Sequence, residues 1–149
     1  MITIKQTQKK IPFDAKQYQK KAFTILTYLN YQDFDLGILL TTNATIRKYN
    51  KIFRQKDSAT DVLSFPYHSQ TKAGKRIKKK SNDDSNLGDI IISIPYVFAN
   101  QKKLEGSFEY RMDQMLVHAI CHLLGYDHID ENDFKKMQKL ERKLLALIR

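Results

Sequence analysis

The sequence predicts an α+β fold, in which helices pack on one mixed β-sheet and a central helix carries a three-histidine metal site. Short apolar runs typical of strands come early in the chain, and segments with helical periodicity dominate its end. The chain opens with a βαβ pattern, and a later run suggests an antiparallel neighbour. Three of the four histidines lie between positions 118 and 128, on the helix expected to be the most buried.

Size and composition are those of one globular domain spanning residues 1–149. Cys121 is the single cysteine, so no disulfide can form within the chain and a reducing compartment fits. The N-terminal residues lack the apolar run of a secretory signal, and no apolar stretch reaches membrane-spanning length. We therefore expect a soluble cytoplasmic protein that does not act at a membrane.

The formal net charge of +10 is large for a chain of this size. Lysine and arginine side chains bind phosphates and release counterions, so nucleic acid is the polyanion that best fits this excess. The alternative is a basic surface that only keeps the protein in solution. The charge therefore favours a nucleic-acid partner, and it leaves the fold undetermined.

The N-terminal part of the chain predicts the βαβ unit. Apolar and polar residues alternate from Ile2 to Gln6, which indicates a strand. Asp14 is placed to cap a helix of about fifteen residues, and residues 33–42 follow as a buried strand. The helix is expected to pack on the sheet through the apolar stripe of Tyr18, Ala22, Ile25, Leu26 and Leu29.

A shorter helix is predicted from Asn43, as its cap, to Arg54. Its last turn is basic, with Lys51 and Arg54 inside it and Lys56 just beyond. The helix dipole favours cations at the C-terminal end of a helix, so these basic residues can be explained by helix stability alone. Lys51 and Lys56 are also candidates for contact with nucleic-acid phosphates.

Residues 62–65 and 87–93 have the composition of strands, and Pro66 stops the first. Residues 67–86 between them are polar and irregular, which predicts an exposed, mobile loop. Two explanations of its charge remain open: a solubilising insertion, or a flexible contact to nucleic-acid phosphates. The basic side chains concerned are Lys72, Lys75, Arg76, Lys78, Lys79 and Lys80.

Three further helices are predicted, near Ser93, from Ser107 and after the loop 125–131. The helix from Ser107 is apolar around most of its circumference, which is typical of a central, buried helix. His118 and His122 share its remaining polar stripe, so they are expected at the base of a cleft. The final helix is expected to face the core with Phe134, Met137, Leu140, Leu144 and Leu147.

The chain is organised around a pattern of three histidines. His118 and His122 are four residues apart and therefore lie on one helix face. Gly125 can leave the helix in a left-handed conformation, and the turn can fold His128 back toward the other two. Three imidazoles with a fourth position open are typical of a catalytic zinc, because structural sites usually close with four protein ligands. We expect one Zn²⁺ per chain.

The spacing of these histidines and of the glycine matches the long zinc-protease motif, but Ala119 stands where that motif has its glutamate. The glutamate is the general base of peptide hydrolysis, so this is a zincin-like motif that lacks its base. Its absence argues against a protease. The neighbouring Cys121 projects about 100° away from His122 and is expected to be buried and unligated.

Three segments, taken in order, resemble the YbeY family of bacterial endoribonucleases and rRNA maturation factors. They are Thr60–Pro66, Leu87–Ile90 and His118–His128, and the resemblance covers residues 40–130. It implies a zinc-dependent, single-strand-specific endoribonuclease acting in rRNA maturation and ribosome quality control, with rRNA precursors and the ribosomal subunit as partners. It also implies that the three histidines of the motif are the zinc ligands.

The resemblance further implies a functional arginine, which follows an Asn-x-x-Phe pattern and maps onto Arg54. Its guanidinium would clamp the RNA phosphate and stabilise the charge that builds on the phosphate oxygens. Asp61 and Asp127 are candidates to orient a histidine ring, and turn or capping roles suit both at least as well. Ala119 and Cys121 depart from the residues usual in the family, and the basic loop looks longer than its norm.

Two other functions fit these residues. The first is a zinc peptidase or amidase whose general base comes from elsewhere in the chain. The second is a non-catalytic, rRNA-binding assembly factor in which zinc only stabilises the fold. The charge and the missing glutamate favour the nuclease over both.

Overall fold

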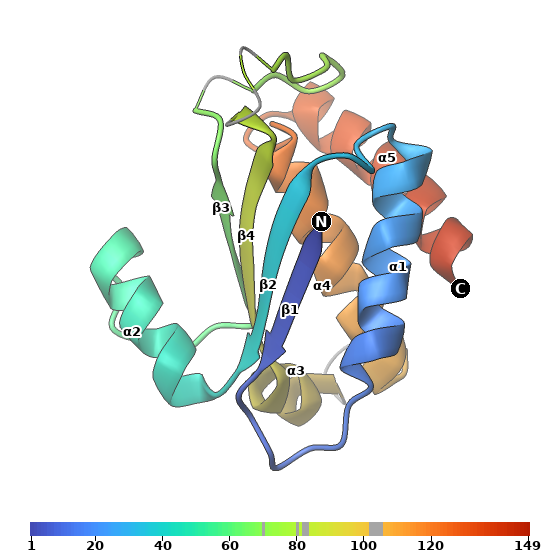
Figure 1. Ribbon diagram of the computed structural model, residues 1–149. Coiled ribbons are helices and arrows are strands. Elements are labelled where there is room, and N and C mark those ends of the chain that lie inside the picture. The colour runs from blue at the N-terminus through green and yellow to red at the C-terminus, as the bar shows by residue number, and fades with distance from the viewer. Residues whose placement is uncertain (70, 80, 82–83, 102–105) are drawn as a thin grey trace.

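The computed structural model describes residues 1–69, 71–79, 81, 84–101 and 106–149. Its strands are β1 (Ile2–Gln6), β2 (Asp35–Thr41), β3 (Val62–Pro66) and β4 (Asn86–Ser93). Within the described residues they form one sheet in the order β1-β2-β4-β3 (Figure 1). The β1–β2 and β2–β4 pairs are parallel, whereas β3 runs antiparallel to β4. This confirms the predicted α+β fold with a mixed sheet.

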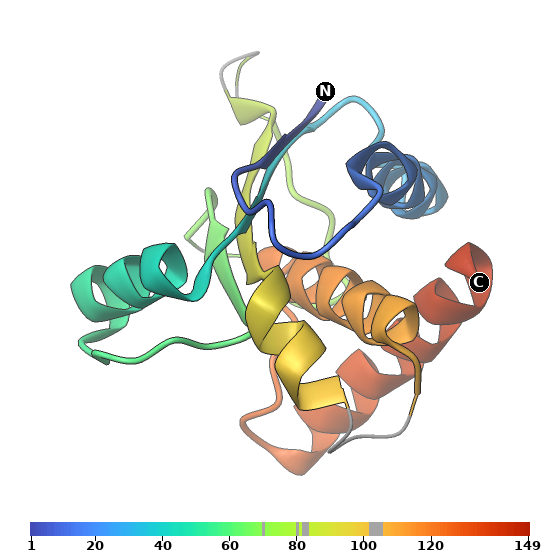
Figure 2. The ribbon, with the colours of Figure 1, turned by 90° about the horizontal axis from the view of Figure 1, so that it is seen from below.

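The helices cover the two faces of the sheet unequally. α1 (Ala15–Tyr28), α4 (Phe108–Leu123) and α5 (Glu131–Ile148) lie on one side, and the short α3 (Ile94–Asn100) packs beside α4. On the other side, α2 (Asn43–Arg54) is the one helix found among the described residues (Figure 1, Figure 2). No helix in the described part of the chain combines the length and apolarity needed to cross a membrane.

Polar caps begin the helices largely where the sequence predicts them. The side chains of Asp14, Ser93 and Ser107 accept hydrogen bonds from backbone amides in the first turns of α1, α3 and α4. The predicted cap of α2 is wrong by one residue, because Thr42 caps this helix and Asn43 is its first helical residue. Asn43 instead accepts a hydrogen bond of 2.6 Å from the Ser93 hydroxyl, which links the starts of α2 and α3.

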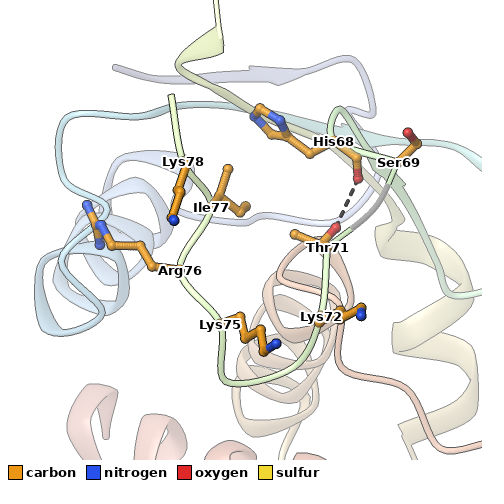
Figure 3. Close-up of a pocket in the computed structure, with 8 residues that line it drawn as sticks. All are labelled: His68, Ser69, Thr71, Lys72, Lys75, Arg76, Ile77 and Lys78. Carbon is orange, nitrogen blue, oxygen red and sulfur yellow. Dashed lines mark hydrogen bonds between the residues drawn. The ribbon is translucent and has the colours of Figure 1, made fainter. Parts of the chain in front are cut away.

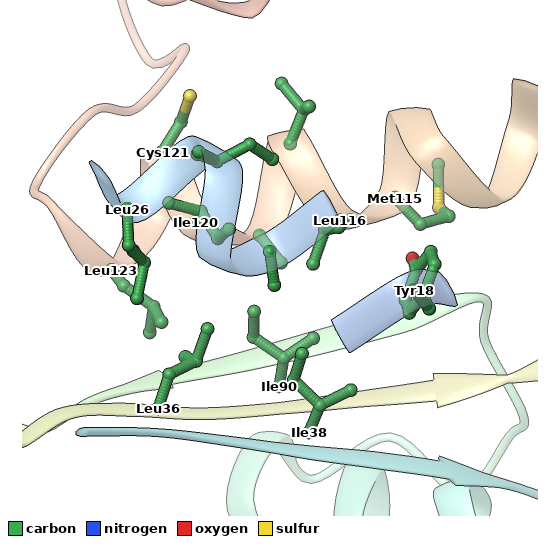
Figure 4. Close-up of a cluster of buried hydrophobic side chains, with 14 of the residues drawn as sticks. Tyr18, Leu26, Leu36, Ile38, Ile90, Met115, Leu116, Ile120, Cys121 and Leu123 are labelled. Carbon is green, nitrogen blue, oxygen red and sulfur yellow. The ribbon is translucent and has the colours of Figure 1, made fainter. Parts of the chain in front are cut away.

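Helix α4 lies at the centre of the main core, as its apolar circumference predicts. Leu116, Ile120 and Leu123 of α4 share one buried cluster with Leu36 and Ile90 of the sheet (Figure 4). None of these five side chains is more than 1% exposed. Burying each such side chain contributes about 1.5–3 kcal/mol, so contact with the sheet fixes the rotation of α4 about its own axis.

Helix α2 is attached to the opposite face of the sheet by a separate, smaller cluster. Ile46 of α2 packs there with Leu63 of β3 and Ile91 of β4, and all three are buried. The other large apolar side chains of α2 point outward: Tyr49 is 36% exposed, Ile52 67% and Phe53 58%.

The inward face of α5 differs from the prediction. Met137 and Leu144 are buried as expected, but Phe134 is 49% exposed and Leu147 is 40% exposed. Ile148 is buried in their place. The inward stripe therefore runs through positions 137, 141, 144 and 148, at the spacing that places residues on one helix face. This stripe includes a charged residue, Glu141.

The basic segment between β3 and β4 is irregular, as predicted, but it is anchored rather than freely exposed. Ile77 is buried, and its amide donates a hydrogen bond of 2.9 Å to the Tyr31 hydroxyl. The Arg76 guanidinium lies 4.6 Å from the centre of the Tyr31 ring, and Lys79 pairs with a carboxylate at 2.9 Å. One apolar side chain within the charged run thus holds the loop to the body of the protein. Lys80 lies outside the described residues.

Replacing Gly88 with alanine should lower the free energy of unfolding by about 2–4 kcal/mol. Gly88 has φ +134°, and an added Cβ would lie 2.2 Å from the Phe65 carbonyl oxygen in the paired strand β3. Gly74→Ala is the matched control, because Gly74 also has a positive φ, of +78°, but no atom within 4 Å of the added carbon. Urea denaturation should show a clearly smaller loss for the control, and equal losses would contradict the overlap.

Candidate metal centre and cleft

The C-terminal half of α4 brings two imidazoles together, and the following loop supplies a third. His118 and His122 lie one turn apart, and their Nε2 atoms are 3.0 Å from each other. The ring centre of His128 lies 5.9 Å from that of His118 and 5.5 Å from that of His122. One ring nitrogen from each histidine falls within 4.8 Å of the others. The predicted three-histidine cluster is therefore present.

Gly125 allows the chain to turn back toward the helix. It has φ +90°, and its amide donates to the His122 carbonyl at 3.0 Å while the Tyr126 amide donates to the Cys121 carbonyl at 3.0 Å. A Cβ at this position would lie 2.7 Å from the backbone of Thr71 in the basic loop. Glycine is thus required twice, by the left-handed turn and by the close approach of another segment.

The hydrogen bonds of the two helical histidines determine which ring nitrogens are free. Nδ1 of His118 lies 3.2 Å from a carboxylate oxygen of Glu141, and Nδ1 of His122 lies 2.9 Å from the Tyr126 carbonyl oxygen. An ionised carboxylate and a carbonyl can only accept, so each Nδ1 donates. In the neutral rings both Nε2 atoms then carry lone pairs that face each other.

This arrangement fits a divalent metal ion. Two facing lone pairs 3.0 Å apart repel each other, and a cation between them removes that repulsion. Nitrogen ligands 2.0–2.1 Å from a tetrahedral ion stand about 3.3 Å apart, so a small ring movement suffices. Burial, reinforced by the nearby His118, lowers the pKa of His122, and the neutral ring is the form that binds metals.

Cys121 does not join this group. Its side chain is fully buried, as predicted, and burial raises the pKa of its thiol to about 12. Sulfur binds metals as the thiolate, so a buried neutral thiol beside His122 is a packing residue. The group of side chains able to hold a metal among the described residues consists of His118, His122 and His128.

Glu141 is the partner that sequence reasoning missed. The predicted partners, Asp61 and Asp127, accept hydrogen bonds from the backbone amides of Val62 and Ile129. Neither bonds to His118 or His122, whose ring partners are Glu141 and a backbone carbonyl. For His128, which has no hydrogen bond to a described residue, orientation by a carboxylate stays a prediction. A charged residue on the inward stripe of α5 was the available signal.

The three histidines open onto a cleft of about 900 Å³, and Arg54 also lines this cleft. Arg54 ends α2, is exposed, and makes no hydrogen bond or ion pair with a described residue. Asp61 and Asp127 also line the cleft. Lys51 and Lys56 do not line it, and Lys51 lies 3.9 Å from the Asp57 carboxylate. The structure thus brings the predicted arginine and the histidines to one cavity.

A second concavity, of about 550 Å³, adjoins this cleft, and the basic loop forms it (Figure 3). His68, Ser69 and Thr71 line both cavities. Four of the residues predicted to contact RNA line this basic pocket. Lys79 does not line it and instead forms an ion pair with Asp33. The four are Lys72, Lys75, Arg76 and Lys78.

Together, the fold and the site define an α+β protein whose three-histidine group, able to hold a metal ion, opens onto a cleft beside a basic pocket. Comparison with known proteins identifies its family. Residues 1–149 match the family described as endoribonuclease YbeY, and the chain belongs to that family. This confirms the resemblance predicted from three motifs and extends it from residues 40–130 to the whole chain.

Two relatives are similar to this chain along most of their length. The chain is 35% identical over 144 residues to endoribonuclease YbeY of Homo sapiens, which covers 97% of this chain and 86% of that protein. It is 32% identical over 149 residues to endoribonuclease YbeY of Alkaliphilus metalliredigens, with 97% and 93% covered. A solution structure from Thermotoga maritima is 23% identical, with a TM-score of 0.65 over 99% of this chain and 89% of that one. This last likeness shows a shared fold.

Removing the Glu141 carboxylate should weaken metal binding about 10- to 100-fold, because the His118 ring loses the acceptor that fixes its tautomer and orientation. Glu141→Ala is the test variant, and Glu141→Gln, which keeps a carbonyl acceptor, should lose less. Glu131→Ala is the matched control, because Glu131 begins the same helix and its one ion pair with a described residue is to the exposed Lys135, at 3.5 Å. Competition with a chromophoric chelator measures the affinity. Wild-type affinity in Glu141→Ala would contradict this role.

Proposed function

We propose that this protein is a zinc-dependent, single-strand-specific endoribonuclease that acts in the cytoplasm in rRNA maturation and ribosome quality control. The observation that carries the proposal is a single cavity lined by three converging imidazoles and by Arg54, which makes no hydrogen bond or ion pair with a described residue. The relatives described as endoribonucleases support RNA as the substrate. The net charge of +10 supports a polyanionic partner.

Zinc is the proposed ion, one per chain, because three neutral nitrogen ligands and an open position are the usual donor set of catalytic zinc. Such an ion supplies Lewis acidity, which polarises a phosphate oxygen and lowers the pKa of water toward neutrality. The chain's part is to hold His118 and His122 in the tautomer that directs Nε2 into the cleft. Glu141 and the Tyr126 carbonyl do this through the two Nδ1 atoms.

Arg54 is proposed to bind the phosphate that is cleaved. A guanidinium donates paired hydrogen bonds to phosphate oxygens and stays charged throughout the accessible pH range. Arg54 makes no ion pair with a described residue, so binding a phosphate breaks no ion pair among the described residues. Held opposite the histidines, it would stabilise the charge that develops on the phosphate oxygens as the bond breaks.

The missing glutamate supports nuclease over peptidase activity. Ala119 lines the cleft and has no group that can accept a proton. The general base that peptide hydrolysis uses at this place in zinc proteases is therefore absent. Asp61 and Asp127 are the carboxylates that line the cleft in the described part of the chain, and they are the candidates for proton transfer and for orienting His128.

The basic pocket next to the cleft is proposed to hold RNA phosphates on either side of the cleaved nucleotide. Its four basic side chains form a concave surface that continues into the cleft through shared lining residues. Lys51 and Lys56 would add contacts near the end of α2. Precursors of rRNA on the ribosomal subunit are the proposed substrate, and their phosphates match this distribution of charge.

His118→Ala and His122→Ala should each lose the metal and RNA cleavage together, because two imidazoles do not hold the ion as firmly as three. His68→Ala is the control for metal content, since His68 lines the cleft but lies outside the three-histidine group. Elemental analysis should be paired with cleavage assays on single-stranded and duplex rRNA fragments. Full activity in metal-stripped His118→Ala protein, or cleavage of peptides but not of RNA, would rule the proposal out.

Arg54→Ala should retain the metal and lose about 10²–10³-fold in the rate of single-turnover cleavage, because the charge on the phosphate oxygens loses its partner. Arg54→Lys should recover part of the rate. Arg47→Ala is the matched control on the same helix, where Arg47 is already paired with Asp57 at 2.8 Å. A wild-type rate in Arg54→Ala, with its metal retained, would remove Arg54 from the mechanism.

A further inference from the structure

A groove of about 590 Å³ lies on the side of the sheet that α2 only partly covers. Its floor is the outer face of the strands, including Gly37 of β2 and Asp89 of β4. Its walls carry Tyr49 and Phe53 of α2 and Phe65 of β3. The groove is separate from the main core, which lies on the opposite face of the sheet.

Two of the three aromatic side chains in this groove are exposed. Tyr49 and Phe53 are stacked nearly parallel, at 11° with ring centres 6.2 Å apart. Phe53 meets Phe65 edge-on, with ring centres 5.2 Å apart. Tyr49 is 36% exposed and Phe53 is 58% exposed, so large aromatic surfaces remain in contact with water. Flat rings with a free face are the surfaces on which nucleobases stack.

A carboxylate lies on the floor beside these rings. Gly37 and Asp89 are paired across β2 and β4, and a Cβ on Gly37 would lie 2.2 Å from a carboxylate oxygen of Asp89. The absence of a side chain on Gly37 therefore makes room for the carboxylate to lie over the sheet. Asp89 is exposed and makes no side-chain hydrogen bond with a described residue. It repels phosphate, but it can accept hydrogen bonds from the amino group of a base.

The groove is continuous with the cleft that holds the three histidines. Phe53 and Phe65 line both cavities, whereas the next residue after Phe53, Arg54, lines only the cleft. At the end of α2, Phe53 thus lines both the groove and the cleft, and the next residue, Arg54, lines the cleft. A strand whose phosphate reaches Arg54 has its neighbouring base beside Phe53.

We propose that this aromatic groove binds a nucleobase of single-stranded RNA next to the nucleotide whose phosphate occupies the cleft, and that Asp89 favours bases with an exocyclic amino group. The inference rests on the proposed nuclease function and adds a base-binding subsite to it. It also gives a physical origin for single-strand specificity. A base held in a duplex has both faces stacked and its amino group paired, so it cannot enter the groove.

Equilibrium binding to metal-free protein tests the groove without depending on cleavage. The probe is a short oligoribonucleotide with 2-aminopurine at successive positions, whose fluorescence is quenched when that base stacks. Quenching should occur at one position with wild type, and it should be lost in Phe53→Leu and Tyr49→Leu with about 5- to 100-fold weaker binding. Phe23→Leu and Tyr28→Leu are matched controls, because Phe23 is 54% and Tyr28 52% exposed on α1.

A second measurement tests the carboxylate. Wild type should bind oligoadenylate and oligocytidylate more tightly than oligouridylate, and Asp89→Asn should narrow this difference. Circular dichroism of wild type and of each variant is the check that the substitution leaves the fold intact.

Each outcome decides the proposal separately from the nuclease function. Leucine variants that bind and quench like wild type would overturn the groove while wild-type RNA cleavage stands. Unchanged RNA affinity with altered self-association of the Tyr49→Leu or Phe53→Leu protein would show that the groove is a protein interface, and the base subsite would be wrong. If wild type neither binds nor cleaves RNA, the proposed function itself has failed, and the subsite fails with it.

Discussion

The burial of α4 is the constraint on which the rest of the structure depends. Most side chains of this helix are buried in the main core, and its two histidines are half-buried at the edge of the cleft, where an unpaired ring nitrogen would cost free energy. His118 meets that requirement with Glu141, and His122 meets it with the Tyr126 carbonyl. Both solutions use Nδ1 and leave Nε2 directed at the cleft. Two hydrogen bonds at Nδ1 thus leave both helical histidines with the nitrogen that can bind a metal facing the cleft.

The features that depend on local spacing could be predicted from the sequence. The apolar circumference of α4, the positions of His118 and His122, and the left-handed turn at Gly125 all follow from helix geometry and backbone sterics. The mixed sheet follows from short apolar runs separated by helical segments. The position of Arg54 could not be predicted from spacing alone. The helix dipole accounts for a cation at this place, and the structure adds that Arg54 lines the same cleft as the histidines.

The features that depend on distant contacts could not be predicted. Glu141 lies 23 residues from His118 in the sequence, and the inward face of α5 had been placed too close to Phe134 and Leu147. Helical periodicity in an amphipathic helix leaves the exact direction of its apolar stripe open, and packing decides it. In the basic loop, the many charges predicted an exposed segment, and the role of the single Ile77 was not foreseen. Its burial against the body of the protein holds the loop in place.

The two sides of the cleft belong to different hydrophobic cores. The histidine side is built into the main cluster, whereas α2 rests on Ile46, Leu63 and Ile91 alone among the fully buried residues described. Regions with few buried apolar contacts open at lower free energy than the rest of a protein. The α2 side of the cleft, which carries Arg54, can therefore change its position at lower free energy than the histidine side. One side of the cleft can thus adjust to the shape of a ligand while the other holds the three histidines in fixed positions.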